Sequence, residues 1–135
     1  MKVFLTGASG YIGGSVARRL MELGHEVFGL VRSEQKAQQI QQLGMQPVIG
    51  TLSDAAVLAE AAHLADAVIH TANSDDRASV ETLLGALAGS GKLFIHVSGS
   101  SIVADEAMGE YANPIAFTED TRFKPVPNRK QCGDQ

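Results

Sequence analysis

The sequence predicts an α/β fold, a doubly wound parallel sheet with helices on both faces and therefore three αβα layers. Five short apolar runs alternate with longer runs in which apolar residues recur at helical spacing. Several of the short runs are almost continuously apolar, which is typical of strands that are covered on both faces. Right-handed crossovers between such strands predict the spatial order 3-2-1-4-5.

The individual elements follow from the spacing of apolar residues and from the glycines between them. The expected strands cover residues 2–6, 26–31, 47–52, 67–72 and 93–98. The expected helices cover residues 12–23, 34–43, 55–63 and 77–88. After residue 101 the pattern weakens, and it predicts a short helix over 104–110 and a loop over 113–127. We therefore expect one domain over residues 1–127 and a polar tail, 128–135; whether this tail belongs to a truncated C-terminal part stays open.

Local signals predict how three of these helices begin and pack. Ser33 and Asp54 each precede a helix, and the oxygen of such a side chain can accept a hydrogen bond from the first helical turn. In the last helix, the residues Leu83, Leu84 and Leu87 are expected to face the sheet.

Composition excludes several classes of protein. The chain has 135 residues, a net charge of −4 and no basic cluster, which argues against a general nucleic-acid binder. No apolar stretch approaches the length of about 18 residues that a membrane span requires, and no secretory signal pattern is present. Cys132 is the single cysteine of the chain, so no internal disulfide can form and we expect a cytoplasmic protein. The four histidines of the chain lack metal-ligand spacing, so we expect no metal site.

The first expected strand leads into a glycine-rich turn, Gly7-Ala8-Ser9-Gly10-Tyr11-Ile12-Gly13. Glycines at these positions allow a tight turn, a close approach of a ligand to the backbone, and close packing of helix on strand. The helix that follows offers unpaired N–H groups and a partial positive charge to an anion. The motif therefore predicts a Rossmann-type dinucleotide site. Its pyrophosphate would lie against Gly7, Ser9, Gly10, Tyr11, Ile12 and Gly13.

The end of the second expected strand indicates which dinucleotide is bound. An acidic residue about 20 residues after the glycine loop usually binds a free ribose 2′-hydroxyl. Arg32 stands there instead, followed by Ser33 and, further on, by Lys36. A guanidinium can bind a 2′-phosphate through paired hydrogen bonds, so NADP is favoured over NAD. The alternative is a surface arginine that stacks on adenine without selecting the phosphate.

The opening, residues 6–13, resembles that of extended and atypical short-chain dehydrogenases/reductases, the NAD-dependent epimerase/dehydratase group. Residues 50–54 and 68–72 are similar to the third- and fourth-strand segments of that group. The resemblance implies that Leu52 packs on adenine and that Thr71 and Ala72 lie along the adenosine and its ribose. Thr51 replaces the aspartate that the family usually has there. Asn73 follows the fourth strand, where contact with a ribose and a role in the turn are equally open.

The same resemblance implies a serine after the fifth strand that orients the substrate, together with a Tyr-x-x-x-Lys pair. Gly99 aligns best with the position of that serine, so the candidates are its neighbours Ser98 and Ser100, and a purely structural role for them is equally open. The residues four positions after Tyr11 and Tyr111 are Ser15 and Ile115, so neither tyrosine is followed by the expected lysine. Either the protein is part of a longer one or it is an atypical member of the family.

Two functions are therefore expected. The first is an NADP(H)-dependent oxidoreductase or epimerase/dehydratase that acts on a small carbonyl or hydroxyl substrate. The alternative is a regulator or redox sensor that binds NADP without turning over a substrate.

Overall fold

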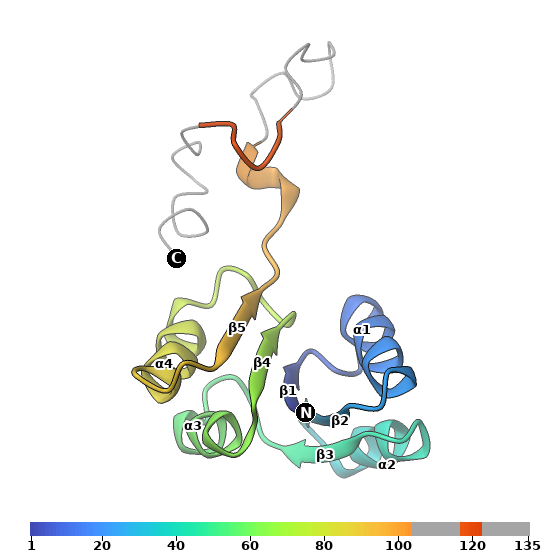
Figure 1. Ribbon diagram of the computed structural model, residues 1–135. Helices are drawn as coiled ribbons and strands as arrows, with labels where there is room; N and C mark the ends of the chain where they lie inside the picture. The colour runs from blue at the N-terminus through green and yellow to red at the C-terminus, as the bar shows by residue number, and fades with distance from the viewer. Residues whose placement is uncertain (104–116, 123–135) are drawn as a thin grey trace. The chain divides into compact units, whose positions relative to one another are not determined.

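The computed structural model describes residues 1–103 and 117–122. The chain divides into two compact units, Met1–Val97 and Ser98–Gln135. The first unit contains every strand and α-helix of the described part (Figure 1). In the second unit the described residues form a short 3-10 helix, Ser100–Val103, which the sequence pattern did not predict. They also form a turn that is closed by a hydrogen bond from the Thr121 N–H to the Thr118 carbonyl.

A single parallel sheet forms the centre of the first unit. Its strands are β1 (Lys2–Thr6), β2 (Glu26–Val31), β3 (Gln46–Ile49), β4 (Ala67–His70) and β5 (Leu93–His96). All pairings are parallel, and the order is β3-β2-β1-β4-β5. The predicted fold class and the predicted strand order are therefore confirmed.

Two helices cover each face of the sheet (Figure 1). The helices are α1 (Tyr11–Glu22), α2 (Glu34–Gln42), α3 (Ala55–Leu64) and α4 (Arg77–Leu87). Side chains of α1 and α2 pack with Val3, Leu5 and Val27 on one face. Side chains of α3 and α4 pack with Phe4 and Val68 on the other. Because β1 contributes to both cores, it is buried from Val3 to Thr6. The glycine turn therefore starts from a strand end that is held on both sides by packing.

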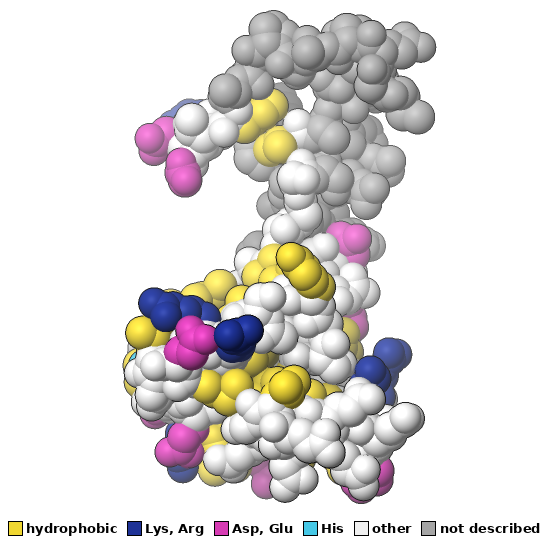
Figure 2. Space-filling model, turned by 90° about the vertical axis from the view of Figure 1, so that its right-hand side faces the viewer, with side chains coloured by type: hydrophobic (Ala, Val, Ile, Leu, Met, Phe, Trp, Pro, Cys, Tyr) yellow, Lys and Arg dark blue, Asp and Glu magenta, His cyan; other side chains and the backbone are white. Residues whose placement is uncertain are grey.

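The outer surface carries both signs of charge. Figure 2 shows basic and acidic side chains interspersed with small apolar areas on the face that is turned to the viewer. No helix in the described part of the chain is long and apolar enough to cross a membrane.

Strand ends differ from the prediction in a systematic way. The strands expected to reach Leu52, Ala72 and Ser98 end at Ile49, His70 and His96. The last paired residues explain this, because Ile49 is opposite Val31 and the other two strands end together, His70 opposite His96. Beyond these pairs the chain has no neighbouring strand to follow, and it turns away to form loops.

The helix signals were partly right. The Ser33 side chain accepts a hydrogen bond from the Lys36 N–H at 3.3 Å, as expected for a cap of α2. The Asp54 side chain does not cap α3, because its carboxylate accepts hydrogen bonds from Thr51 instead. Leu84 was expected to face the sheet, but it is 42% exposed while its neighbour Leu83 is fully buried. The helix expected over 104–110 and the boundary expected after residue 127 lie outside the described residues.

Candidate dinucleotide-binding site

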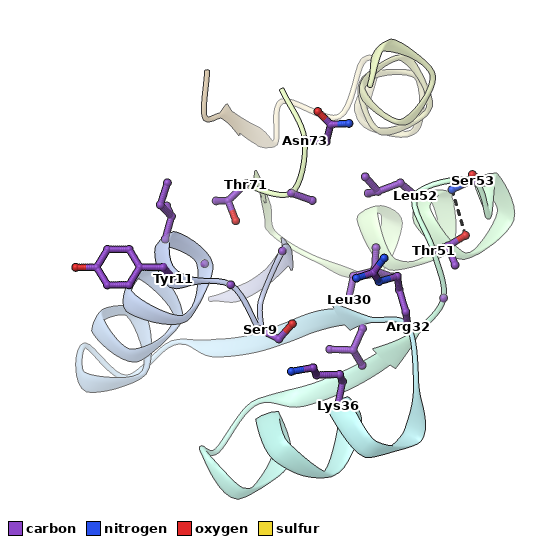
Figure 3. Close-up of a pocket in the computed structure, with 17 residues that line it drawn as sticks. Ser9, Tyr11, Leu30, Arg32, Lys36, Thr51, Leu52, Ser53, Thr71 and Asn73 are labelled. Atoms are coloured by element: carbon purple, nitrogen blue, oxygen red, sulfur yellow. Dashed lines mark hydrogen bonds between the residues drawn. The ribbon is translucent and has the colours of Figure 1, made fainter. Parts of the chain in front are cut away.

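A cavity of about 810 Å³ opens at the carboxyl edge of the sheet, around the ends of β1, β2, β3 and β4 (Figure 3). This volume is in the range of pockets that hold small molecules and cofactors. Ligands of doubly wound sheets bind at this edge, where the strand order reverses beside β1. The cavity is lined by Gly7, Ser9, Gly10, Tyr11, Ile12, Gly13, Leu30, Val31, Arg32, Lys36, Gly50, Thr51, Leu52, Ser53, Thr71, Ala72 and Asn73.

The turn after β1 needs glycine at its first position. Gly7 has a φ of +71°, in the left-handed region that side chains with a Cβ avoid. A Cβ at Gly7 would also lie 2.7 Å from the Thr71 hydroxyl oxygen. The turn is closed by a 2.9 Å hydrogen bond from the Gly10 N–H to the Gly7 carbonyl. The backbone of β1 therefore turns sharply against the segment that follows β4.

Gly13 brings α1 close to that turn. It is buried, and a Cβ at this position would run into the Gly7 carbonyl oxygen. The same Cβ would lie 2.9 Å from the Thr71 hydroxyl oxygen. The helix therefore begins directly behind the turn, with its N-terminal end at the cavity.

The N-terminus of α1 has the properties of an anion site. Gly10 is the N-cap residue, so no side-chain oxygen caps the first turn, and that turn holds no acidic residue. The N–H groups of a first helical turn have no partners within the helix, and the helix dipole adds partial positive charge there. Ser9, Tyr11 and Ile12 line the cavity at this end, and Tyr11 as a whole is 93% exposed. These residues can hold a pyrophosphate chiefly through backbone groups.

Positive charge lines the cavity where β2 ends. Arg32 directly follows β2 and Lys36 lies in the first turns of α2, and both are labelled at the cavity in Figure 3. The cavity lining contains no aspartate or glutamate. The three ion pairs in which both partners are described residues do not involve Arg32 or Lys36. This end of the cavity therefore favours an additional anionic group on the ligand.

The loop after β3 closes the adjacent side of the cavity. The Thr51 N–H and hydroxyl donate hydrogen bonds of 2.6 and 2.8 Å to one Asp54 carboxylate oxygen. These bonds, the backbone one foremost, hold the pKa of Asp54 below its usual value. The Ser53 N–H in turn donates to the Thr51 hydroxyl oxygen at 3.3 Å (Figure 3). The compact turn presents Leu52 to the cavity, and the packing of Leu52 on adenine stays a prediction.

The segment after β4 forms the opposite wall. The Thr71 hydroxyl donates to the Thr6 carbonyl at 2.8 Å, and the Thr71 N–H donates to the Thr6 hydroxyl at 3.2 Å. Ala72 and Asn73 also line the cavity on this side, and Asn73 is labelled beyond Thr71 in Figure 3. The Asn73 side chain accepts from the Asp75 N–H at 3.1 Å, so it also serves the turn.

The structure brings all but one of the expected cofactor residues together around this cavity. The exception is Ser33, whose oxygen caps α2 and which does not line the cavity. Sequence reasoning had not singled out Leu30, Val31, Gly50 and Ser53. Their signal is position alone, because they stand at or just past the ends of β2 and β3.

The two candidate catalytic serines belong to the second compact unit. Ser98 follows β5 and is exposed, and Ser100 begins the short 3-10 helix. Their role in chemistry stays a prediction. Among the residues that the structure describes, no cluster of histidine, cysteine or acidic side chains is arranged to hold a metal ion.

The fold and this cavity define the class: a Rossmann protein with a dinucleotide site at the glycine turn. Residues 7–131 match the model of a family described as NAD(P)H-binding. The chain belongs to this NAD(P)H-binding family. The predicted nicotinamide cofactor is therefore confirmed, without a distinction between NADP and NAD. The predicted relationship to short-chain dehydrogenases/reductases is confirmed as membership of an NAD(P)H-binding family.

Known reductases and dehydrogenases are similar to this chain. A ketoreductase of Stigmatella aurantiaca that acts on 4-hydroxy-2-methyl-3-oxo-4-farnesyl-3,4-dihydroquinoline-1-oxide is 34% identical, over 98% of this chain and 41% of its own length. A decarboxylating sterol-4-alpha-carboxylate 3-dehydrogenase of Dictyostelium discoideum is 33% identical, over 92% of this chain and 42% of its own. The chain thus spans about two fifths of the length of these relatives.

A solved structure supports the fold. The yeast methylglyoxal/isovaleraldehyde reductase complexed with NADPH superposes with a TM-score of 0.64 at 20% identity. The match covers 79% of this chain and 40% of the yeast protein.

Proposed function

We propose that this chain binds NADP(H) in the cavity, and that the protein is a reductase or epimerase/dehydratase for a small carbonyl or hydroxyl compound. The observation that carries the proposal is the charge of the cavity lining. Arg32 and Lys36 contribute two cations beside the end of β2, and no carboxylate is present to bind a free ribose 2′-hydroxyl. Cations of this kind recognise a 2′-phosphate, whereas NAD-binding sites usually place an acidic residue here.

The remaining lining residues fit the rest of the cofactor. The pyrophosphate would bind at the N-terminus of α1, beside Ser9 and Gly10. Leu52 offers an apolar surface to adenine, and the wall of Thr71, Ala72 and Asn73 would guide the chain of the cofactor past β4. When bound, the nicotinamide supplies a hydride donor or acceptor, and the residues described here bind and orient it.

The reaction class is supported by the relatives, which are named as a ketoreductase and a dehydrogenase. Ser98 and Ser100, which follow β5, are the proposed groups for orienting the substrate oxygen. If a substrate is found, Ser98→Ala should lower kcat and leave the affinity for NADPH unchanged. An unchanged kcat in both Ser98→Ala and Ser100→Ala would remove these serines from the mechanism.

Titration of the full chain with NADPH and with NADH, followed by calorimetry, tests the cofactor assignment. NADPH should bind at least about tenfold more tightly, the effect of one charge-assisted contact. Equal affinities would contradict the proposed role of Arg32. Oxidation of NADPH should then be measured over a panel of aldehydes and ketones. Tight binding with no oxidation would favour the alternative of a regulator that only binds the cofactor.

A further inference from the structure

The cavity wall that follows β4 is supported from behind by a buried imidazole. His70 is the last residue of β4 and is fully buried. Its Nδ1 atom lies 2.8 Å from the Thr6 hydroxyl oxygen, and its Nε2 atom lies 3.0 Å from the Asn73 carbonyl oxygen. One side chain thus joins the last residue of β1 to the last lining residue of the opposite wall.

The partners of the ring determine where its proton lies. A carbonyl oxygen can only accept, so Nε2 must donate to Asn73. In a neutral ring Nδ1 is then an acceptor, and the Thr6 hydroxyl donates to it. The Thr6 oxygen accepts in turn from the Thr71 N–H at 3.2 Å. Every polar atom of this chain of hydrogen bonds has a partner of the right kind when His70 is neutral with its proton on Nε2.

The surroundings also favour the neutral ring. His96 of β5 stacks on His70 with a centroid distance of 5.3 Å and an interplanar angle of 10°. Burial, first of all, lowers the pKa of His70, the neighbouring His96 lowers it further, and the Asn73 bond and the Asp76 carboxylate at the start of α4 oppose this. The described elements around the ring thus bring one further imidazole and one carboxylate to bear on its charge.

The wall held by His70 is in contact with the glycine turn. The Thr71 hydroxyl oxygen lies 2.7 and 2.9 Å from the points where a Cβ would start at Gly7 and Gly13. The glycines thus leave no room for a side chain between this wall and the turn, and a shift of Thr71 towards them would displace the turn or the start of α1. Hydrogen bonding at His70 is therefore coupled mechanically to the anion site.

We infer that neutral His70 is a positioning residue for dinucleotide binding, because it holds the Thr71–Asn73 wall against the end of β1. This inference rests on the proposed function of the cavity. Protonation would place a second donor, Nδ1–H, against the Thr6 hydroxyl, whose own proton would then lose its acceptor. Acid, or loss of the imidazole, should loosen the wall and weaken binding.

The test compares wild type with His70→Gln and His70→Leu as full chains, by titration with NADP⁺ between pH 8 and pH 5.5. A glutamine can still donate to Asn73, whereas leucine removes both hydrogen bonds. At pH 8 the glutamine variant should bind about fivefold more weakly, the effect of one buried hydrogen bond, and the leucine variant more weakly still. His63→Gln, at an exposed position on α3, is the matched control and should bind as wild type does.

The ratio of wild-type to variant affinity is the decisive quantity, because titration of the ligand's own 2′-phosphate cancels in it. This ratio should shrink towards one as the pH falls, since wild type loses the neutral ring that the variants already lack. A ratio already near one at pH 8, where the His70 ring is neutral, would overturn the inference while leaving cofactor binding intact. Failure of wild type to bind NADP⁺ at pH 8 would overturn the proposed function, and the inference with it.

A second measurement does not depend on variants that fold. Long-range ¹H–¹⁵N spectra of the labelled wild-type chain report the protonation of each histidine ring. The His70 signals should show a neutral ring with its proton on Nε2 at pH 7. A proton on Nδ1, or a charged ring, would overturn the inference whatever the binding data show.

Discussion

The hydroxyl oxygen of Thr71 lies 2.9 Å from the point where a side chain at Gly13 would begin. Two segments far apart in the sequence, the start of α1 and the loop after β4, thus meet with no room for a methyl group. The glycine turn is shaped by this contact as well as by its own conformation, and the contact allows its steric role to be tested separately from ligand binding.

Gly13→Ala should destabilise the fold, because its Cβ would run into the Gly7 carbonyl oxygen and crowd Thr71. Overpacking of this kind costs about 1–3 kcal/mol of unfolding free energy, measurable by thermal or urea denaturation. Gly85→Ala in α4 is the matched control, since nothing lies within 4 Å of its Cβ position. That change should leave stability equal or raise it by up to about 1 kcal/mol, from helix propensity. Equal effects of the two substitutions would show that packing at Gly13 is not tight.

Arg32→Ala should weaken binding of NADPH by roughly tenfold to a hundredfold, because charge-assisted hydrogen bonds to the 2′-phosphate are lost. Binding of NADH should change little, and calorimetry with both cofactors measures the difference. Arg18→Ala is the control, because it removes the same charge from α1 at a side chain that is 82% exposed and absent from the cavity lining. If the two cofactors lost affinity equally in Arg32→Ala, the guanidinium would serve the shared part of the ligand.

Thr51→Val should raise the pKa of Asp54 towards its usual value, because the hydroxyl donor to the carboxylate is removed. Part of the lowering should remain, since the Thr51 N–H still donates to the same oxygen. Carboxyl-carbon NMR titration of Asp54 in both proteins measures this. An identical titration in wild type and variant would show that the hydroxyl bond does not contribute in solution.

Stability should fall in mild acid because of His70. Its folded-state pKa lies below the usual value of 6.5, so the unfolded chain takes up the proton first as the pH falls. The contribution is complete above pH 6.5 and is lost as the pH drops from there through the lowered value, with a slope of up to about 1.4 kcal/mol per unit. Urea denaturation of wild type and His70→Gln at several pH values isolates this contribution. Parallel pH profiles of the two proteins would rule out a lowered pKa of His70 in the folded state.

Regular features of the fold could be predicted from the sequence. Glu26–Val31 has the same bounds in prediction and structure, and the strand order follows from the handedness of the crossovers. The strand expected over residues 47–52 ends at Ile49, because its own sequence does not show where its pairing with β2 stops. Strand ends depend on pairing with segments that are distant in sequence, and apolar periodicity does not report this.

The site could be predicted only as far as the order of elements determines it. Arg32 directly follows β2, and Asn73 lies in the loop after β4; both line the cavity because these strands end at the same edge. The direction of a loop side chain could not be predicted from the sequence. Asp54, for example, accepts a hydrogen bond from Thr51 instead of capping α3. The role of His70 could not be seen at all, since it depends on hydrogen bonds between β1, β4 and the loop that follows.

All residues that line the cavity fall between Gly7 and Asn73, within the first compact unit. The residues that are proposed to select the cofactor therefore lie in one continuous segment of the chain. The residues that are proposed to act on the substrate come later, after β5. On the proposed assignments, exchange of that segment, or a change at Arg32 alone, would alter which dinucleotide is used and leave the residues that are proposed to meet the substrate unchanged. The two specificities of such a protein can thus be engineered one at a time.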